Sequence, residues 1–397
     1  MRQIFFTLDK VFVFFSFLII VVLLFIPTGF PTNAYPNSTR AEAKILSVDN
    51  SMVYNTGGII LQGSQKCEVE ILSGKFKGEK RTALNRYMGK LEFDKTFFEG
   101  ERAFVVIDYL DEKITHINII DHYRIRLELF LFAGFMLLLI LYARWTGVKA
   151  LISFVLTILV IWKILIPGFL KGWNPIIISM ISVVFLTLII ITLIGGVNKR
   201  SLAAILGSLS GTGLTCILAI SFGNVFKIHG AIMPFSESLL YSGFAHLNLT
   251  QIFIAGIFIA SSGALMDISM DISTAVYELV QKNPNLSKAE AIKSGFVIGR
   301  AVIGTMTTTL LLAYSGGYVA LLMVFMAQGT PLMNVFNLRY VSAEILHTIV
   351  GSFGLVTVAP FTAILAGILF TKKEVVKEEV LMKNNNNIDS RLEKETV

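Results

Sequence analysis

Five ionisable side chains stand within or at the edge of long apolar segments in the second half of the chain: Asp267, Asp271, Arg300, Glu344 and His347. A charge at bilayer depth costs on the order of 2.5–3.5 kcal/mol on insertion scales, so such residues usually face a partner or a water-filled cavity. These side chains are therefore the first candidates for ion or proton chemistry in this protein.

Asp267 and Asp271 are four residues apart, which places both carboxylates on one face of a helix. Two carboxylates on one face can hold a cation or pass a proton. The alternative is that they mark the place where the helix leaves the membrane. Both interpretations stay open for Asp267, and we favour the second for Asp271.

Arg300 lies inside the apolar segment 295–313. It can extend along the helix to the cytoplasmic surface, as Arg does near helix ends, or it can pair with Asp267, which the predicted topology places at the same depth. We predict the pair. Thr305 and Thr309, with Thr308 between them, give the same helix a hydroxyl face that either bonds to a neighbouring helix or lines a pathway.

Glu344 and His347 are three residues apart and can hydrogen-bond on one helix face. Histidine titrates near physiological pH and can carry a proton. The alternative is a capped helix start at the membrane interface. The candidate residues for a substrate or ion pathway are thus Asp267, Asp271, Arg300, Thr305, Thr309, Glu344 and His347.

The composition predicts a polytopic α-helical membrane protein. Of 397 residues, 54% are hydrophobic and 15% are charged, and the mean hydropathy is +0.70. Several apolar runs have the length of about 17–25 residues that crosses a bilayer. The net charge is +7, and the Lys and Arg residues lie mainly at the ends of the apolar segments, as the positive-inside rule expects. The lipid bilayer is therefore the predicted partner of the basic residues, and nucleic acid is not.

The sequence offers little to a cofactor or to covalent chemistry. Cys67 and Cys216 lie in segments of different character, so no bridge is expected between them, and no metal-ligand spacing of Cys or His is present. No nucleophile–base pair and no HExxH sequence occurs. We therefore predict neither a metal nor a cofactor, and no enzymatic activity.

Four domains are predicted. Residues 1–31 contain an apolar run that is either an uncleaved transmembrane anchor, which we prefer, or a signal peptide cleaved near residues 32–34. Residues 32–123 form an extracytoplasmic domain, residues 124–371 a multi-pass transmembrane domain, and residues 372–397 a disordered cytoplasmic tail.

The extracytoplasmic domain is predicted to be β-rich. In QKCEVEIL, Cys67, Val69 and Ile71 share one face and Glu68 and Glu70 the other, which is the period of a half-buried strand. Further strand candidates are residues 44–48, 103–110 and 114–120. Short strands at this spacing predict a small OB-like barrel, which can cap a pore or bind a protein partner.

The number of membrane spans is open between eight and nine. The apolar run 318–333 is interrupted at residues 328–331, and we predict that it is re-entrant, because irregular backbone is tolerated where it is buried or lines a cavity. Eight spans then place both termini in the cytoplasm and put Glu344 and His347 on the outer side, away from Asp267. Nine would gather all these residues on the cytoplasmic side.

Three motifs carry a resemblance to a known family: GALMDISMDI (263–272), IGRAVIGTMTTTLLLAYSGG (298–317) and EILHTIVGSFGLVTVAP (344–360). Together they resemble the YibE/F family of bacterial multi-pass membrane proteins, whose members are described as permeases or simply as membrane proteins. The resemblance implies a bacterial cell membrane. We predict a permease for a small solute or ion, with proton coupling as an option. The alternative is a non-transporting scaffold or assembly factor whose outer β domain binds a partner.

Overall fold

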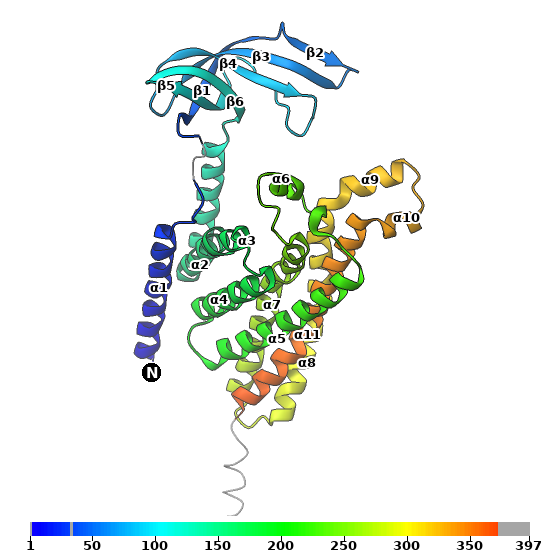
Figure 1. Cartoon of the computed structure of the whole chain (residues 1–397). Coiled ribbons are helices and arrows are strands. Elements are labelled where there is room, and N and C mark those ends of the chain that lie inside the picture. Colours follow the sequence, from blue (N-terminus) through cyan, green and yellow to red (C-terminus); the bar gives the residue numbers. More distant parts are fainter. Residues whose placement is uncertain (1, 32–34, 372–397) are drawn as a thin grey trace, which may run out of the picture. The chain divides into compact units, whose positions relative to one another are not determined.

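A computed structural model describes residues 2–31 and 35–371. The predicted tail 372–397 and the predicted cleavage position at residues 32–34 lie outside the described residues. The chain divides into two compact units, one of residues 30–142 and one that combines residues 1–29 with the chain from residue 143 onward (Figure 1). We call the first the β unit and the second the helical unit.

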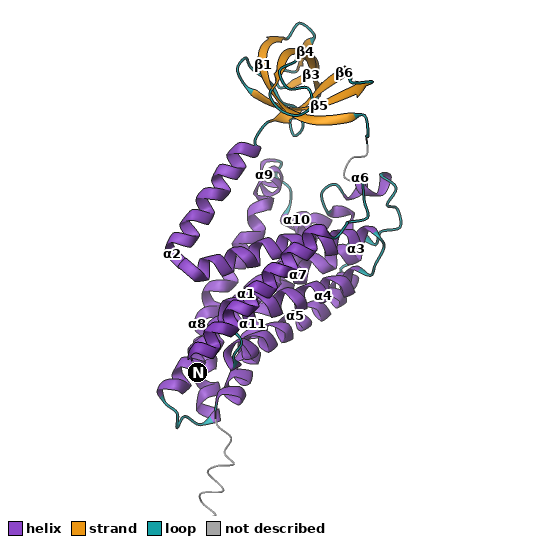
Figure 2. Cartoon of the chain, turned by 90° about the vertical axis from the view of Figure 1, so that its left-hand side faces the viewer, coloured by secondary structure: helices purple, strands orange, loops and turns teal. Residues whose placement is uncertain are grey.

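The β unit contains a closed barrel. Its strands are β1 (Ser38–Asp49), β2 (Val53–Thr56), β3 (Ile60–Ile71), β4 (Lys80–Met88), β5 (Arg102–Leu110) and β6 (Lys113–His122). The order β1-β5-β6-β4-β3 closes on itself because β3 also pairs with β1 (Figure 2). Strand β2 extends the sheet beyond β3 (Figure 1). The β4–β6 pair is parallel and the others are antiparallel. This confirms the predicted β-rich domain with a small barrel.

The interior of the barrel follows the predicted alternation. Cys67, Val69 and Ile71 of β3 are fully buried, and they pack with Ile45 of β1 and Val105 of β5. Both cysteines of the protein are free thiols, as expected from their separation.

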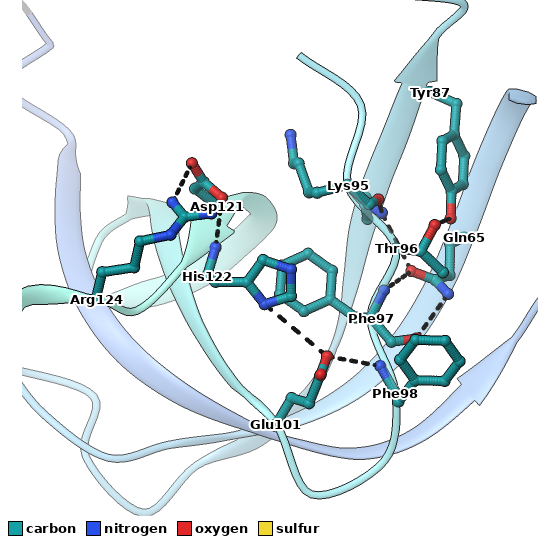
Figure 3. Close-up of polar contacts among 11 residues, drawn as sticks. Gln65, Tyr87, Lys95, Thr96, Phe97, Phe98, Glu101, Asp121, His122 and Arg124 are labelled. Carbon is teal, nitrogen blue, oxygen red and sulfur yellow. Dashed lines mark hydrogen bonds and ion pairs between the residues drawn. The ribbon is translucent and has the colours of Figure 1, made fainter. Parts of the chain in front are cut away.

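A buried amide network closes one part of the barrel. The Asn85 side chain of β4 donates to Gln65 Oε1 at 3.1 Å and to the carbonyl of Lys95 at 2.6 Å. Gln65 in turn donates to the carbonyl of Phe97 at 3.0 Å and accepts from the Phe97 N–H at 3.1 Å (Figure 3). The network pairs the Gln65 amide and the Asn85 NH₂ group, leaves Asn85 Oδ1 without a partner among the described residues, and anchors the segment between β4 and β5.

Helix α2 (Ile125–Val160) follows β6 and changes direction at Arg144, whose φ of 49° and ψ of −122° are not helical. The predicted spans 127–142 and 149–169 therefore lie in one helical stretch, Ile125–Leu170, with a break between them. The stretch ends with η1 (Ile161–Leu165) and α3 (Ile166–Leu170).

The helical unit is built around three long helices. These are α5 (Lys199–Val225), α7 (Leu249–Lys282) and α11 (Arg339–Phe370), and each packs on the other two. Helix α8 (Lys288–Ser315) packs on α11 and α7, and α4 (Pro175–Gly195) packs on α7 and α5. Helix α1 (Arg2–Phe25) packs beside α4.

Six helical stretches in the described part of the chain are long and apolar enough to cross a membrane, and a shorter apolar helix covers Lys10–Phe25. This confirms a polytopic membrane protein. Asparagine side chains cap the starts of α4, α5 and α7. Ser287 and Glu290 form the capping box of α8, which the S-x-x-E sequence indicates.

Small residues bring the helices close together. A methyl group added at Gly211 of α5 would lie 2.9 Å from Leu265 of α7, and one at Gly295 of α8 would lie 2.7 Å from Ala363 of α11. The glycine pairs Gly207 and Gly211 of α5 and Gly295 and Gly299 of α8, each four residues apart, therefore lie at helix crossings, where the missing side chain permits the approach.

The segment 318–333 forms no long helix. It contains η3 (Gly316–Tyr318), α9 (Val319–Ala327) and the start of α10 (Leu332–Asn337), with a turn between α9 and α10. The nine residues of α9 extend about 14 Å at 1.5 Å per residue, roughly half of what a crossing needs. Helix α9 nevertheless follows α8 and η3 without a gap, so that Lys288–Ala327 is one apolar helical stretch. The re-entrant segment, the number of crossings and the side of each loop stay predictions.

The two ends of the helical unit are distinct. One end carries η2 (Gly230–Ile232), α6 (Ser236–Tyr241), α9 and α10 (Figure 1). We call it the α9 end. The other end carries the turn at residues 283–287 between α7 and α8, and we call it the hairpin end.

Candidate functional site

Four polar side chains meet near the α9 end of the helical unit. Tyr314 comes from the last turn of α8, Tyr318 from η3, and Glu344 and His347 from the second and third turns of α11. The rings of Tyr314 and His347 stack with their centroids 4.2 Å apart, and Nδ1 of His347 lies 4.0 Å from Oε2 of Glu344. The Tyr318 side chain interacts with that of Glu344. We call this group the Glu344 cluster.

The Glu344 cluster is shielded from solvent and is not saturated with hydrogen bonds. The side chains of Glu344 and His347 are only 17% and 20% exposed. Nε2 of His347 and the hydroxyl of Tyr314 are buried, and neither has a partner among the described residues. A buried polar group left unpaired costs about 1–3 kcal/mol, so each such group in a native fold calls for an explanation. The cluster thus retains capacity to hold a proton, a cation or a polar ligand group.

Buried hydroxyl groups continue from this cluster toward the middle of the unit. Gly351, one turn after His347 on α11, leaves room for Ser261 of α7, whose Cβ would lie 3.5 Å from a methyl group at that glycine. Gly354, nearly one turn further, faces the hydroxyl of Thr215 on α5. Both hydroxyls are fully buried and donate to carbonyls of their own helices.

The hydroxyl groups extend further along α5. Ser208 and Thr212 are fully buried, and their hydroxyls have no partner in the described part of the chain. Helices α5 and α7 run antiparallel, because the Ser273 hydroxyl donates to the carbonyl of Arg200 at 2.7 Å while Gly223 faces Ile254. Ser208 and Thr212 are therefore level with residues 261–269 of α7. We call Ser208, Thr212, Thr215 and Ser261 the hydroxyl seam.

The sequence analysis missed this seam. Its signal was available, since Ser208, Thr212 and Thr215 recur at intervals of four and three residues, which is one face of a helix. That face adjoins Gly207 and Gly211, whose spacing is typical of close helix packing.

Asp267 and Asp271 share one face of α7, as predicted, and both are exposed. The same face carries Gly256 and Gly263, where an added methyl group would meet no atom within 4 Å. Because Gly351 lies beside Ser261, Glu344 lies about 20 Å along the helix axis from Asp267 at 1.5 Å per residue. The structure therefore does not bring the carboxylates of α7 together with the Glu344 cluster.

The predicted ion pair between Asp267 and Arg300 is absent from the described part of the chain, and that prediction was wrong. Gly299 packs on Ile272 of α7 and Ala359 of α11. Arg300 is rotated by about 100° from it, on an exposed flank of α8. It is also level with Asp271 rather than Asp267. The spacing of residues in the sequence does not determine how α8 is rotated about its axis or how it is positioned along the axis of α7.

The two predicted threonines satisfy their own helix. The Thr305 hydroxyl donates to the carbonyl of Val302 at 3.1 Å, and the Thr309 hydroxyl donates to that of Thr305 at 3.2 Å. Both residues are exposed, so a role in a pathway stays a prediction for them.

The β unit contains a second set of polar contacts near the end of β6, where the chain leaves the barrel. The Glu101 carboxylate accepts from the Phe98 N–H at 2.9 Å and lies 3.9 Å from Nδ1 of His122 (Figure 3). A hydrogen bond from Arg124 lowers the pKa of the Asp121 carboxyl, and the two groups are 2.7 Å apart. These contacts fix the loop before β5 and the segment in which the chain leaves β6. Among the described residues no group of three His, Cys, Asp or Glu could hold a metal ion.

The fold and the site define a multi-pass helical membrane protein that carries a small β barrel and a buried ionisable cluster. Residues 131–372 match the family described as YibE/F-like protein, and residues 37–122 match the YibE/F family N-terminal domain. The chain belongs to the YibE/F family. No curated protein and no solved structure matches it.

Proposed function

We propose that this protein is a permease that moves a small solute or ion across a bacterial cell membrane, with the Glu344 cluster as its ion- or proton-binding site. The observation that carries the proposal is the unsaturated polar chemistry of this cluster inside an apolar helical unit. Tyr314 and His347 hold buried polar atoms without partners in the described structure, and ionisable groups at membrane depth commonly mark ion or proton pathways.

The arrangement supports a sequence of steps. Glu344 and His347 lie on one face of α11 and can exchange a proton, because the imidazole nitrogen and the carboxylate oxygen can each accept the proton that the other releases. A proton or cation bound there adjoins Ser261, one turn along the α7–α11 contact. Hydroxyls of the seam can both donate and accept, so they can pass a proton or coordinate a cation toward the middle of the unit.

Proton flux in liposomes tests this proposal. The full chain is reconstituted with a pH-sensitive dye inside the vesicles, and a potassium diffusion potential drives the flux. We expect flux above that of empty vesicles, at least a tenfold loss in Glu344→Gln, and a similar loss in His347→Asn. Glu278→Gln, which neutralises an exposed carboxylate of α7, is the matched control and should keep the flux. Flux that is equal in all four proteins contradicts the role of the cluster.

A scaffold without transport is the second candidate, and the packing toward the hairpin end favours it. Leu265, Ile268, Ile272, Val358 and Ala363 form one apolar cluster that begins at the level of the hydroxyl seam, and all five residues are 0% exposed. If no water enters the helical unit, it cannot carry a solute, and the surface of the β unit, which would bind a protein partner, becomes the functional part of the molecule. Water access to the hydroxyl seam separates the two candidates.

A further inference from the structure

A groove on the outer flank of α8 combines two cations with an apolar wall. It has a volume of about 450 Å³, and its lining consists of Ala289, Ile292, Lys293, Phe296, Val297 and Arg300. Lys293 and Arg300 are its only charged residues, and neither pairs with an acid in the described part of the chain. The groove therefore offers two unneutralised positive charges beside apolar surface, a combination that the proposed transport site does not use.

Contacts within the unit place Arg300 at the boundary of the apolar layer. Helix α4 has 21 residues, about 31 Å of helix, which just spans a hydrocarbon core. Its last residue, Gly195, lies against Met270 of α7, and the next turn of α7 bonds through Ser273 to Arg200. Gly299 faces Ile272 at the same level. Arg300 is thus level with the polar turn between α4 and α5.

Lys293 lies two turns further toward the hairpin end, about 10 Å along the axis. That end carries the basic turns and is the side predicted to be cytoplasmic. Lys293 and Arg300 line the same groove, and both side chains are long enough to carry their charged groups along apolar surface, so that an anion between them can contact both. Gly304 and Leu311 continue the same flank deeper into the apolar layer, and both are exposed.

We infer that this groove binds an anionic phospholipid of the cytoplasmic leaflet. Its phosphate lies between Lys293 and Arg300, and its acyl chains follow the exposed flank of α8 past Gly304. Two observations favour a lipid as the occupant. The charges are complementary to a phosphate at the level where lipid phosphates lie, and α8 with α9 is the least covered span, with 6% of its apolar window buried against 33–56% elsewhere in the described chain.

Native mass spectrometry of the full chain in detergent tests the inference, with phosphatidylglycerol and phosphatidylcholine as probes. Each cation near a membrane surface contributes about 1 kcal/mol to the binding of anionic lipid, which is about fivefold in affinity. We expect wild-type protein to prefer phosphatidylglycerol. The double variant Lys293→Gln with Arg300→Gln should lose about 30-fold in affinity for it and keep its weak binding of phosphatidylcholine.

Two further variants keep the test falsifiable. Lys282→Gln with Lys288→Gln removes two exposed cations of the same hairpin outside the groove and should bind phosphatidylglycerol as wild type does. Lys293→Arg with Arg300→Lys retains both charges and should keep the preference, even if the neutral variant fails to fold. Equal binding of the two lipids by wild type overturns the inference. So does unchanged phosphatidylglycerol binding in the neutral variant, or a change only in its oligomeric state, which would indicate a protein contact.

Discussion

Replacing Glu42 by Gln should lower the free energy needed to open the barrel of the β unit by about 2 kcal/mol. Glu42 of β1 is only 3% exposed, and its carboxylate accepts from Arg102 of β5 and from Arg126 of α2, the latter at 2.9 Å. A hydrogen bond to a charged group contributes about 1.5–3 kcal/mol. Arg102 and Arg126 are 46% and 61% exposed, and solvent screens such pairs. We therefore assign about 1 kcal/mol to each bond.

Hydrogen exchange of the full chain in detergent, followed on peptides of β1 and β5, measures this loss. A loss of 2 kcal/mol corresponds to about 30-fold faster exchange through opening of the barrel. Arg126→Gln should give about half the loss in free energy, because one of the two bonds remains. Glu99→Gln, at an exposed carboxylate without a partner in the described chain, is the control. Protection of β1 in Glu42→Gln within twofold of wild type would refute the reasoning.

Three further outcomes follow from the packing and the electrostatics. Gly354→Val should destabilise the helical unit by about 1–3 kcal/mol through collision with Thr215, while Gly213→Val, where the site is open, should stay near wild type in detergent melting. Burial raises the pKa of the Cys67 thiol to about 11. In a Cys216→Ala background its alkylation at pH 8 should therefore be at least 100-fold slower than in denatured protein, and comparable rates would contradict the burial. The hydrogen bond from Arg124 lowers the pKa of Asp121 in the folded state, so its stabilisation is present above the unfolded value of about 3.8 and is lost as pH falls below it. Asp121→Asn should cost up to about 1 kcal/mol at pH 7 and progressively less as the pH falls through the lowered folded-state pKa of Asp121, as measured by hydrogen exchange.

The pattern of the sequence predicted those elements whose side chains alternate without interruption. Cys67, Val69 and Ile71 indicated β3 because each second residue is apolar. Strand β4 was not predicted, since its inward side chains include Asn85, a polar residue that becomes tolerable only through its bonds to Gln65 and Lys95. Local alternation cannot reveal a partner that lies 20 residues away.

For the candidate site, spacing along one helix was informative and placement between helices was not. The i, i+3 spacing of Glu344 and His347 correctly placed both side chains on one face of α11. The stacking of Tyr314 on His347 depends on how α8 is rotated against α11, which no spacing encodes. The same unknown rotation made the Asp267–Arg300 pair a wrong prediction.

Water access to the hydroxyl seam tests the central claim most directly. In a background with Cys67→Ala and Cys216→Ala, single cysteines are placed at Ser261 and Thr212, and at Ile272 in the apolar cluster as the control. Each full-length variant is treated in membranes with a small, membrane-impermeant thiol reagent. A permease predicts labelling at Ser261 and Thr212 and protection at Ile272. Protection at all three positions would contradict an aqueous pathway through the seam and favour the scaffold.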